Sequence, residues 1–218
     1  MGDTRSGKHR GGPRTVGAAA ARAVLLAMAL TMAPAGCGQD QGPEATLPGA
    51  VYDPPPPAPA LRLADGAGGR YDISDDRGRL VLVFFGFTKC PDICPATLDR
   101  WARVRAALGP AASRVRFLFV SIDSERDTPA LAAAYAAGFD STFVGVSGTE
   151  GEIGETALAW GVAVSRAPEG GPGAEYDLVH ASQVFVVDHE GLLRWGYGRS
   201  ATVEEITKGI RSLLPGRP

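Results

Sequence analysis

The sequence has few of the side chains from which metal sites and disulfides are built. Its 218 residues include three cysteines and three histidines. Structural zinc usually takes four such ligands, so this small supply limits the metal sites that the chain could form. In contrast, 44% of the residues are hydrophobic, which is enough for a substantial core and predicts one domain with appendages.

The chain also lacks an excess of positive charge. Its formal net charge is −2, and residues 1–36 hold five of the 22 Lys and Arg but one of the 24 Asp and Glu. The rest of the chain is therefore net acidic. Because phosphate binding needs a basic face, this balance argues against nucleic acid as a partner.

No apolar run in the N-terminal region is long enough to span a bilayer comfortably, which takes about 20 residues. The apolar stretch 23–35 follows a basic segment and fits the hydrophobic region of a secretory signal. Ala35, Gly36 and Cys37 follow, as in a bacterial lipoprotein signal, although Pro34 stands where an aliphatic residue is usual. We expect residues 1–37 to be a signal and Cys37 to be lipidated, with ordinary cleavage or an uncleaved anchor as alternatives.

Each of these alternatives places the rest of the chain outside the cytoplasm. If Cys37 carries lipid, the chain is anchored to the outer face of the bacterial cytoplasmic membrane. Residues 38–60 are rich in proline and glycine, with four consecutive prolines at 54–57. Such a composition is typical of a semi-stiff tether. We therefore predict a tether over 38–60 and a folded domain over 61–216.

Strand and helix patterns alternate along the predicted domain. Short apolar pieces separated by turns predict a hairpin over 61–73, and apolar runs predict buried strands over 80–85 and 115–122. Pro95 suits the first turn of a helix, and Thr128-Pro129 is a helix start. The remaining predicted elements are a strand at 143–145, a helix at 154–160, a loop at 167–174, strands at 184–187 and 192–197, and a helix at 203–214. This order predicts an α/β fold, with a central mixed sheet flanked by helices.

Cys90 and Cys94 follow the first buried strand, in LVLVFFGFTKCPDICP. A thiol at a helix N-terminus has a lowered pKa, and two neighbouring thiols can form a reversible disulfide or bind a soft metal such as copper or zinc. A purely structural disulfide would close a very small loop and stabilise the fold little. Lys89, Pro91 and Asp92 around Cys90 are typical loop residues, which argues against the alternative that the two thiols are inert and buried in the core.

The three histidines differ in context. His180 precedes a predicted strand and is a candidate third ligand, although a surface position is the alternative. His189 lies in a turn between two strands, where we expect exposure to solvent, and His9 lies in the signal segment.

Four ordered motifs, GFTKCPDIC, SIDSERDTP, FVGVSG and VHASQVFVVD, resemble those of the Sco (SenC) family over about residues 61–214. The resemblance implies a thioredoxin-like fold with an added N-terminal hairpin. It also implies copper, as Cu(I) or Cu(II), bound by Cys90, Cys94 and His180, and assistance in assembling the CuA centre of cytochrome c oxidase.

Departures from the family pattern lie around these ligands. Val179 and Ala181 flank His180 where the family often has Asp and Ser or Thr, and Ser124 replaces a usual proline. Asp123 matches an acidic residue that the family places near the metal, so it is a candidate supporting residue or, alternatively, a turn residue. We interpret residues 126–128 as structural.

Two functions fit these residues. One is a copper metallochaperone whose partners are the oxidase subunit with the CuA site and other periplasmic copper chaperones. The other is a thiol–disulfide oxidoreductase, or a redox sensor, that works with thiol reductants. Thioredoxin-like reductases have a proline before the strand facing their cysteines, whereas this chain has none between Pro172 and Pro215. Copper delivery is therefore the favoured interpretation. A peroxiredoxin-like peroxidase is a third and weaker interpretation.

Overall fold

The computed structural model describes residues 49–168, 176–180 and 182–214, and it describes side chains for 49–165 and 182–214. The chain divides into Met1–Pro43 and Glu44–Pro218, and all of the described residues belong to the second unit. Among them, no helix combines the length and the apolar character that crossing a membrane requires. Cys37 lies outside the described residues, so its lipidation stays a prediction.

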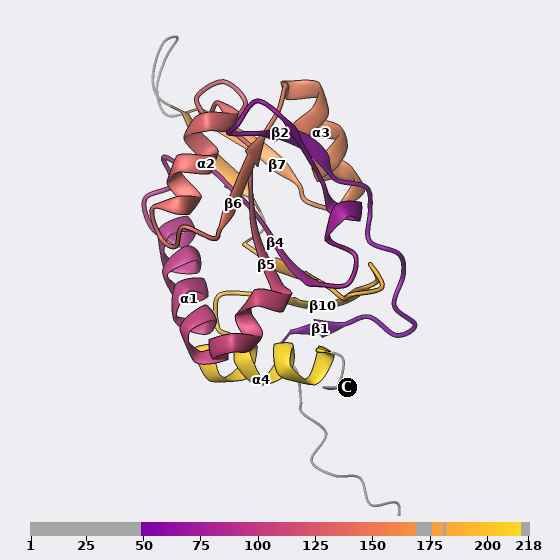
Figure 1. The fold of residues 1–218 in the computed structure, drawn as a ribbon. Coiled ribbons are helices and arrows are strands. Elements are labelled where there is room, and N and C mark those ends of the chain that lie inside the picture. The colour runs from indigo at the N-terminus through magenta and orange to yellow at the C-terminus, as the bar shows by residue number, and fades with distance from the viewer. Residues whose placement is uncertain (1–48, 169–175, 181, 215–218) are drawn as a thin grey trace, which may run out of the picture. The chain divides into compact units, whose positions relative to one another are not determined.

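A mixed eight-stranded sheet forms the centre of this unit (Figure 1). Its strands run in the order β1-β10-β9-β4-β5-β6-β2-β3. The strands β4, β5 and β6 are mutually parallel, whereas β9 lies antiparallel to β4 and β2 lies antiparallel to β6. The bounds are β1 (Ala50–Val51), β2 (Arg62–Asp65), β3 (Arg70–Asp72), β4 (Leu80–Gly86), β5 (Val115–Ser121), β6 (Val144–Ser147), β9 (Val184–Val187) and β10 (Leu193–Tyr197).

Helices cover both faces of the sheet, because the buried strand β4 is apolar on both sides. Leu82 and Phe84 pack in one core cluster with residues of α1, α2 and α4. Val83 and Phe85 pack in the other with residues of α3 and β2. The bounds are α1 (Ile93–Leu108), α2 (Pro129–Ala137), α3 (Glu150–Ala159) and α4 (Val203–Leu213), with short 3-10 turns at Ile73–Asp76 and Gly109–Arg114. The predicted α/β fold with an N-terminal hairpin is confirmed.

Three segments differ from the sequence-based expectations. Residues 50–51 form β1 and pair with β10, so part of the predicted tether joins the sheet. Helix α3 starts four residues early, at Glu150, because Thr149 and Glu152 form a capping box. The loop predicted over 167–174 is wrong at its first two residues, which end strand β7 (Val164–Pro168), the antiparallel partner of β8 (Tyr176–His180).

Candidate functional site

The two cysteines occupy the connection from β4 to α1, at the carboxyl end of a central strand. Cys90 lies in the loop, where its amide donates to the carbonyl of Phe87 at 3.3 Å. Cys94 is the second residue of α1 and is fully buried, whereas Cys90 is half-buried. Both are free thiols in the structure, so the expected reversible disulfide stays a prediction.

The two sulfurs have opposite protonation behaviour. The thiol of Cys94 donates a hydrogen bond to Cys90, and together with the amides of Cys94, Asp92 and Ile93 this lowers the pKa of Cys90 to about 5, although burial opposes the shift. The Cys94 amide lies 3.4 Å from the Cys90 sulfur. The same thiol hydrogen bond, together with burial, raises the pKa of Cys94. At neutral pH, Cys90 is therefore the accessible thiolate and Cys94 the buried proton donor.

Gly86, the last residue of β4, lets the strand pass directly against the buried sulfur. A Cβ atom at this position would lie 2.7 Å from the Cys94 Sγ and 2.9 Å from the ring of Phe119. Real Cβ atoms essentially never approach so closely. The space for the thiol pair therefore depends on a residue without a side chain.

Asp127, one of the residues interpreted from the sequence as structural, anchors the cysteine loop from the segment before α2. Its carboxylate is buried and accepts hydrogen bonds from the Thr88 amide at 2.8 Å and the Thr88 hydroxyl at 2.5 Å. The hydroxyl of Ser121, at the end of β5, donates to the same carboxylate at 2.6 Å. One buried acid thus joins the loop before Cys90 to the neighbouring strand.

Asp123, the predicted supporting acid, is also buried. Its carboxylate pairs with the guanidinium of Arg126. Arg126 in turn lies over the ring of Phe87, 5.9 Å from its centroid, where the cysteine loop begins. Asp123 therefore reaches the loop through Arg126, and its role toward a metal stays a prediction.

His180 is the last residue of β8 and lies opposite Val164 of β7. Its side chain is not among the described ones, so its part in a metal site stays a prediction. Among the described side chains no group of three or more His, Cys, Asp and Glu is placed to hold a metal ion. The prediction that His189 is exposed is wrong, because His189 is half-buried and its Nδ1 is buried.

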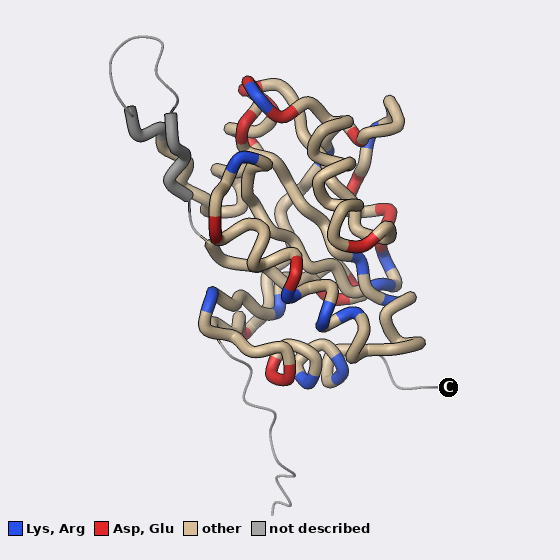
Figure 2. The backbone as a smooth tube through the Cα atoms, turned by 90° about the vertical axis from the view of Figure 1, so that its left-hand side faces the viewer, with Lys and Arg blue, Asp and Glu red and all other residues tan. Residues whose placement is uncertain are grey.

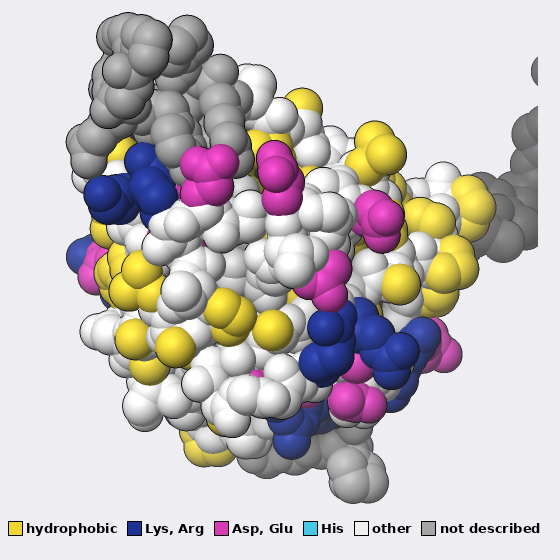
Figure 3. Space-filling view, turned by 90° about the horizontal axis from the view of Figure 1, so that it is seen from above, with side chains coloured by type: hydrophobic (Ala, Val, Ile, Leu, Met, Phe, Trp, Pro, Cys, Tyr) yellow, Lys and Arg dark blue, Asp and Glu magenta, His cyan; other side chains and the backbone are white. Residues whose placement is uncertain are grey.

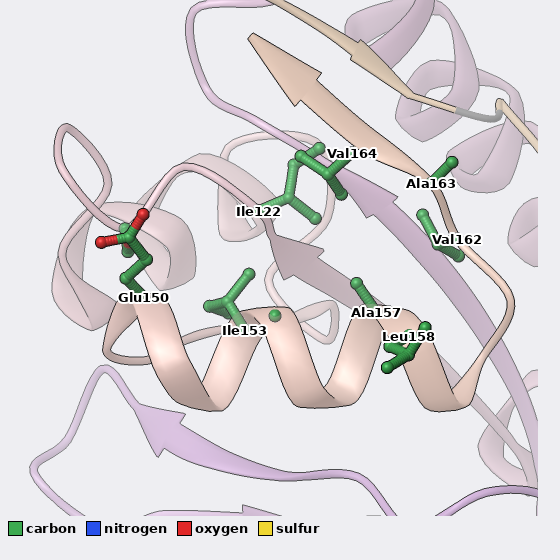
Figure 4. A pocket seen from close by; sticks show the side chains of 10 residues that line it. Ile122, Glu150, Ile153, Ala157, Leu158, Val162, Ala163 and Val164 are labelled. Carbon is green, nitrogen blue, oxygen red and sulfur yellow. The ribbon is translucent and has the colours of Figure 1, made fainter.

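A hollow of about 370 Å³ lies between α3 and the start of β7 (Figure 4). Ile122, Ile153 and Ala157 line it with apolar side chains, and Leu158 beside them is 81% exposed. Seen from above in Figure 3, the domain shows hydrophobic side chains dispersed among acidic and basic groups. The thiol pair is not part of this hollow.

Comparison with known proteins gives consistent matches. The SCO1/SenC family model matches residues 54–215. The mitochondrial SCO2 homologue of Bos taurus is 32% identical over 164 residues, which are 70% of this chain and 61% of that protein. The chain thus spans about three fifths of that relative's length. Among proteins of similar fold is BsSco, a member of the Sco family of cytochrome c oxidase assembly proteins.

Solved structures match the fold closely. Apo Sco1 from Thermus thermophilus superimposes with a TM-score of 0.72 at 36% identity, covering 79% of this chain and all of that one. ScoI from Bradyrhizobium japonicum, solved with copper bound, gives a TM-score of 0.65 at 30% identity, covering 71% of this chain and 98% of that one. The thioredoxin-like architecture is thus confirmed.

Proposed function

Because the chain belongs to the SCO1/SenC family, we propose that it is a copper metallochaperone that assists assembly of the CuA centre of cytochrome c oxidase. Copper, as Cu(I) or Cu(II), is the cargo, and Cys90, Cys94 and His180 are its ligands. The observation that carries this proposal is the thiol pair, with one sulfur ionised at neutral pH and both within one hydrogen-bonded turn. Soft sulfur donors favour Cu(I), and an added imidazole suits Cu(II) as well.

The protonation states of the pair shape how copper binds. Thiols must lose their protons to become ligands, and Cys90 has already done so at neutral pH. Cys94 keeps its proton in the free protein, so loading releases that proton and the affinity falls as the pH falls. The loop anchor at Asp127 and the bare backbone at Gly86 hold the two sulfurs in place for this exchange.

The cellular location of the domain is part of the same proposal. A signal over 1–37 with lipidation at Cys37, followed by a tether, would hold the domain at the outer face of the cytoplasmic membrane. There it would meet the oxidase subunit that carries the CuA site, and periplasmic copper chaperones that supply the metal. Intact-mass measurement of the membrane-extracted protein tests this step, and an unmodified Cys37 contradicts it.

A second function, thiol–disulfide exchange, is favoured by the low pKa of Cys90. Its thiolate would attack a client disulfide and form a mixed disulfide, releasing one client thiolate. Cys94 would then give up its proton and displace the second client sulfur, leaving a reduced client and an oxidised Cys90–Cys94 pair. A thiol reductant must restore the pair before the next cycle.

Copper titration of two single variants, His180→Ala and His189→Ala, tests the proposed ligand set. We expect His180→Ala to lose tight Cu(II) binding while Cys90 and Cys94 still form a disulfide, and His189→Ala to bind copper like the parent. If His180→Ala binds both copper states like the parent, the ligand set is wrong. If the metal-free parent reduces an oxidised CuA domain catalytically and no copper reaches the apo domain, thiol exchange replaces copper delivery.

A further inference from the structure

A second hollow, of about 480 Å³, adjoins the outer side of the cysteine loop and is lined by two arginines. The polar or loop-proximal residues that line it are Asp92, Ile93, Thr97, Arg100, Arg199 and Ser200. Asp92 and Ile93 are the residues whose amides help to lower the pKa of Cys90. The hollow therefore begins within the turn that contains the accessible thiolate.

The two arginines come from different elements that the core holds together. Arg100 lies on α1, on the same helical face as Ile93 and Thr97, while Cys94 is buried on the face that enters the core. Arg199 follows β10, two residues after Tyr197. The Trp101 indole of α1 donates to the Tyr197 hydroxyl at 2.9 Å, and this buried bond fixes the spacing of the two segments.

Neither guanidinium is neutralised within the part of the chain that the structure describes. No ion pair there joins Arg100 or Arg199 to a carboxylate, whereas Arg103, one turn further along α1, pairs with Asp99 at 2.7 Å. Asp92 is the single carboxylate among the residues that line the hollow. Two guanidinium groups against one carboxylate leave the hollow with net positive charge.

The amide groups at the N-terminus of α1 are not the source of this positive charge in the hollow. The Cys94 amide, in the first turn, donates to the Cys90 sulfur, and the Asp92 and Ile93 amides act on the same sulfur. The arginine side chains are therefore the groups left to bind an anion. Figure 2 shows Lys and Arg positions gathered toward the end of the domain formed by α1 and α4, with acidic positions more frequent toward the opposite end.

We infer that Arg100 and Arg199 bind carboxylates of an acidic segment of the client protein and dock that segment beside Cys90. This inference rests on the proposed function. Guanidinium groups form paired hydrogen bonds with carboxylates, and complementary charge orients an encounter and speeds it. A protein segment fits this hollow better than a free phosphate does. Asp92 repels the compact, multiply charged phosphate more strongly than it repels the single, separated charges of carboxylates on a protein segment.

The test compares two double variants of the full chain. Arg100→Ala/Arg199→Ala removes the proposed docking groups, and Arg62→Ala/Arg103→Ala removes the same net charge from two arginines that already have ion-pair partners. Titration of each copper-free protein with a soluble apo CuA domain, followed by NMR at low ionic strength, gives Kd. Transfer kinetics from the copper-loaded proteins give the second-order rate constant per bound copper.

For the docking variant we expect a Kd about tenfold higher and a transfer rate about tenfold lower, with copper loading unchanged. The control should stay within about twofold of the parent, and Arg100→Lys/Arg199→Lys should recover part of the loss. Equal Kd values for the docking variant and the control would overturn the inference, as would inhibition of docking by inorganic phosphate at matched ionic strength. A parent that docks the CuA domain but transfers no copper would instead overturn the chaperone function.

Discussion

The two cysteines show how much a four-residue spacing leaves undecided. The sequence predicts that a thiol at the start of a helix has a lowered pKa, but it does not say which one. In the structure the first helical turn directs its amides toward Cys90, while the side chain of Cys94 turns into the core. The residue before the helix, and not the one inside it, is consequently the thiolate.

The pH dependence of alkylation should expose this asymmetry. The lowered pKa predicts that Cys90 in the metal-free protein reacts with iodoacetamide at a constant rate down to about pH 5 and more slowly below, because protonation removes the thiolate. Cys94 should stay unmodified. Peptide mapping by mass spectrometry measures both rates.

Substitutions of Cys94 provide the control for this profile. Cys94→Ala removes the thiol that donates to Cys90, so the inflection should move to higher pH. Cys94→Ser keeps a donor of similar size, so its inflection should stay closer to that of the parent. An inflection near the ordinary thiol pKa in the parent would show that the hydrogen bonds do not stabilise the thiolate.

Tyr135 is a residue whose placement no sequence pattern indicated. Its ring packs on Phe119, with centroids 5.2 Å apart, yet its buried hydroxyl has no hydrogen-bond partner among the described residues. Burial, and then electrostatic interaction with the Cys94 and Cys90 pair, raise the pKa of this hydroxyl. A buried, unpaired hydroxyl costs stability.

Removal of that hydroxyl should therefore stabilise the domain. We expect Tyr135→Phe to raise the free energy of unfolding by about 1 kcal/mol, measured by urea denaturation of the copper-free protein. Tyr197→Phe is the matched control, because its hydroxyl accepts from Trp101 and its loss should lower the free energy by about 1 kcal/mol. Destabilisation by both substitutions would show that the Tyr135 hydroxyl has a partner in solution.

At the scale of elements, the cysteine loop depends on α2 and β5 as much as on its own residues. Asp127, just before α2, binds Thr88 of the loop and Ser121 of β5. The Ser147 hydroxyl of β6 also donates to the backbone carbonyl of Asp127, at 2.8 Å. A sequence pattern shows Asp127 only as a residue near a helix start, since its partners are distant in the chain.

Asp127→Ala should loosen this connection. Because it deletes three hydrogen bonds to a buried carboxylate, we expect a loss of about 3 kcal/mol in the free energy of unfolding and faster alkylation of Cys94. Asp140→Ala is the control, since Asp140 also accepts from a nearby amide and hydroxyl, both of Thr142, and pairs with Arg105 at 3.4 Å, but it is only half-buried. Its cost should be at most about 1 kcal/mol. Equal costs would mean that the loop does not depend on Asp127.

The predicted elements that succeed are those whose signal is local. The apolar runs of β4 and β5 and the Thr128-Pro129 start of α2 appear where the sequence places them. The sequence does not predict the hairpin of β7 and β8, because Val164–Pro168 mixes polar and apolar residues and ends on proline. The capping box of Thr149 and Glu152 is also a local signal, and it starts α3 four residues before the predicted position.

At the scale of the molecule, the edge strand β1 of the sheet is formed by residues whose composition predicts a tether. A run rich in proline cannot form a core alone, yet it can add an edge strand where an existing strand supplies the hydrogen-bond partners. The Tyr52 amide donates to the Arg194 carbonyl at 3.0 Å, and the Leu193 amide donates to the Pro56 carbonyl at 2.8 Å. The end of the tether is therefore decided by β10, which is about 140 residues away in sequence.

Two N-terminal truncations test this arrangement. A chain that begins at Glu44 keeps β1 and should unfold like the parent domain. A chain that begins at Pro59 loses β1 and the backbone hydrogen bonds of residues 52–58, so we expect a loss of about 2 kcal/mol in the free energy of unfolding. Its uncovered β10 edge should also promote association between copies, because an unpaired strand edge can pair with another chain. Urea denaturation and light scattering measure the two effects, and identical results for both truncations would show that residues 44–58 act only as a tether.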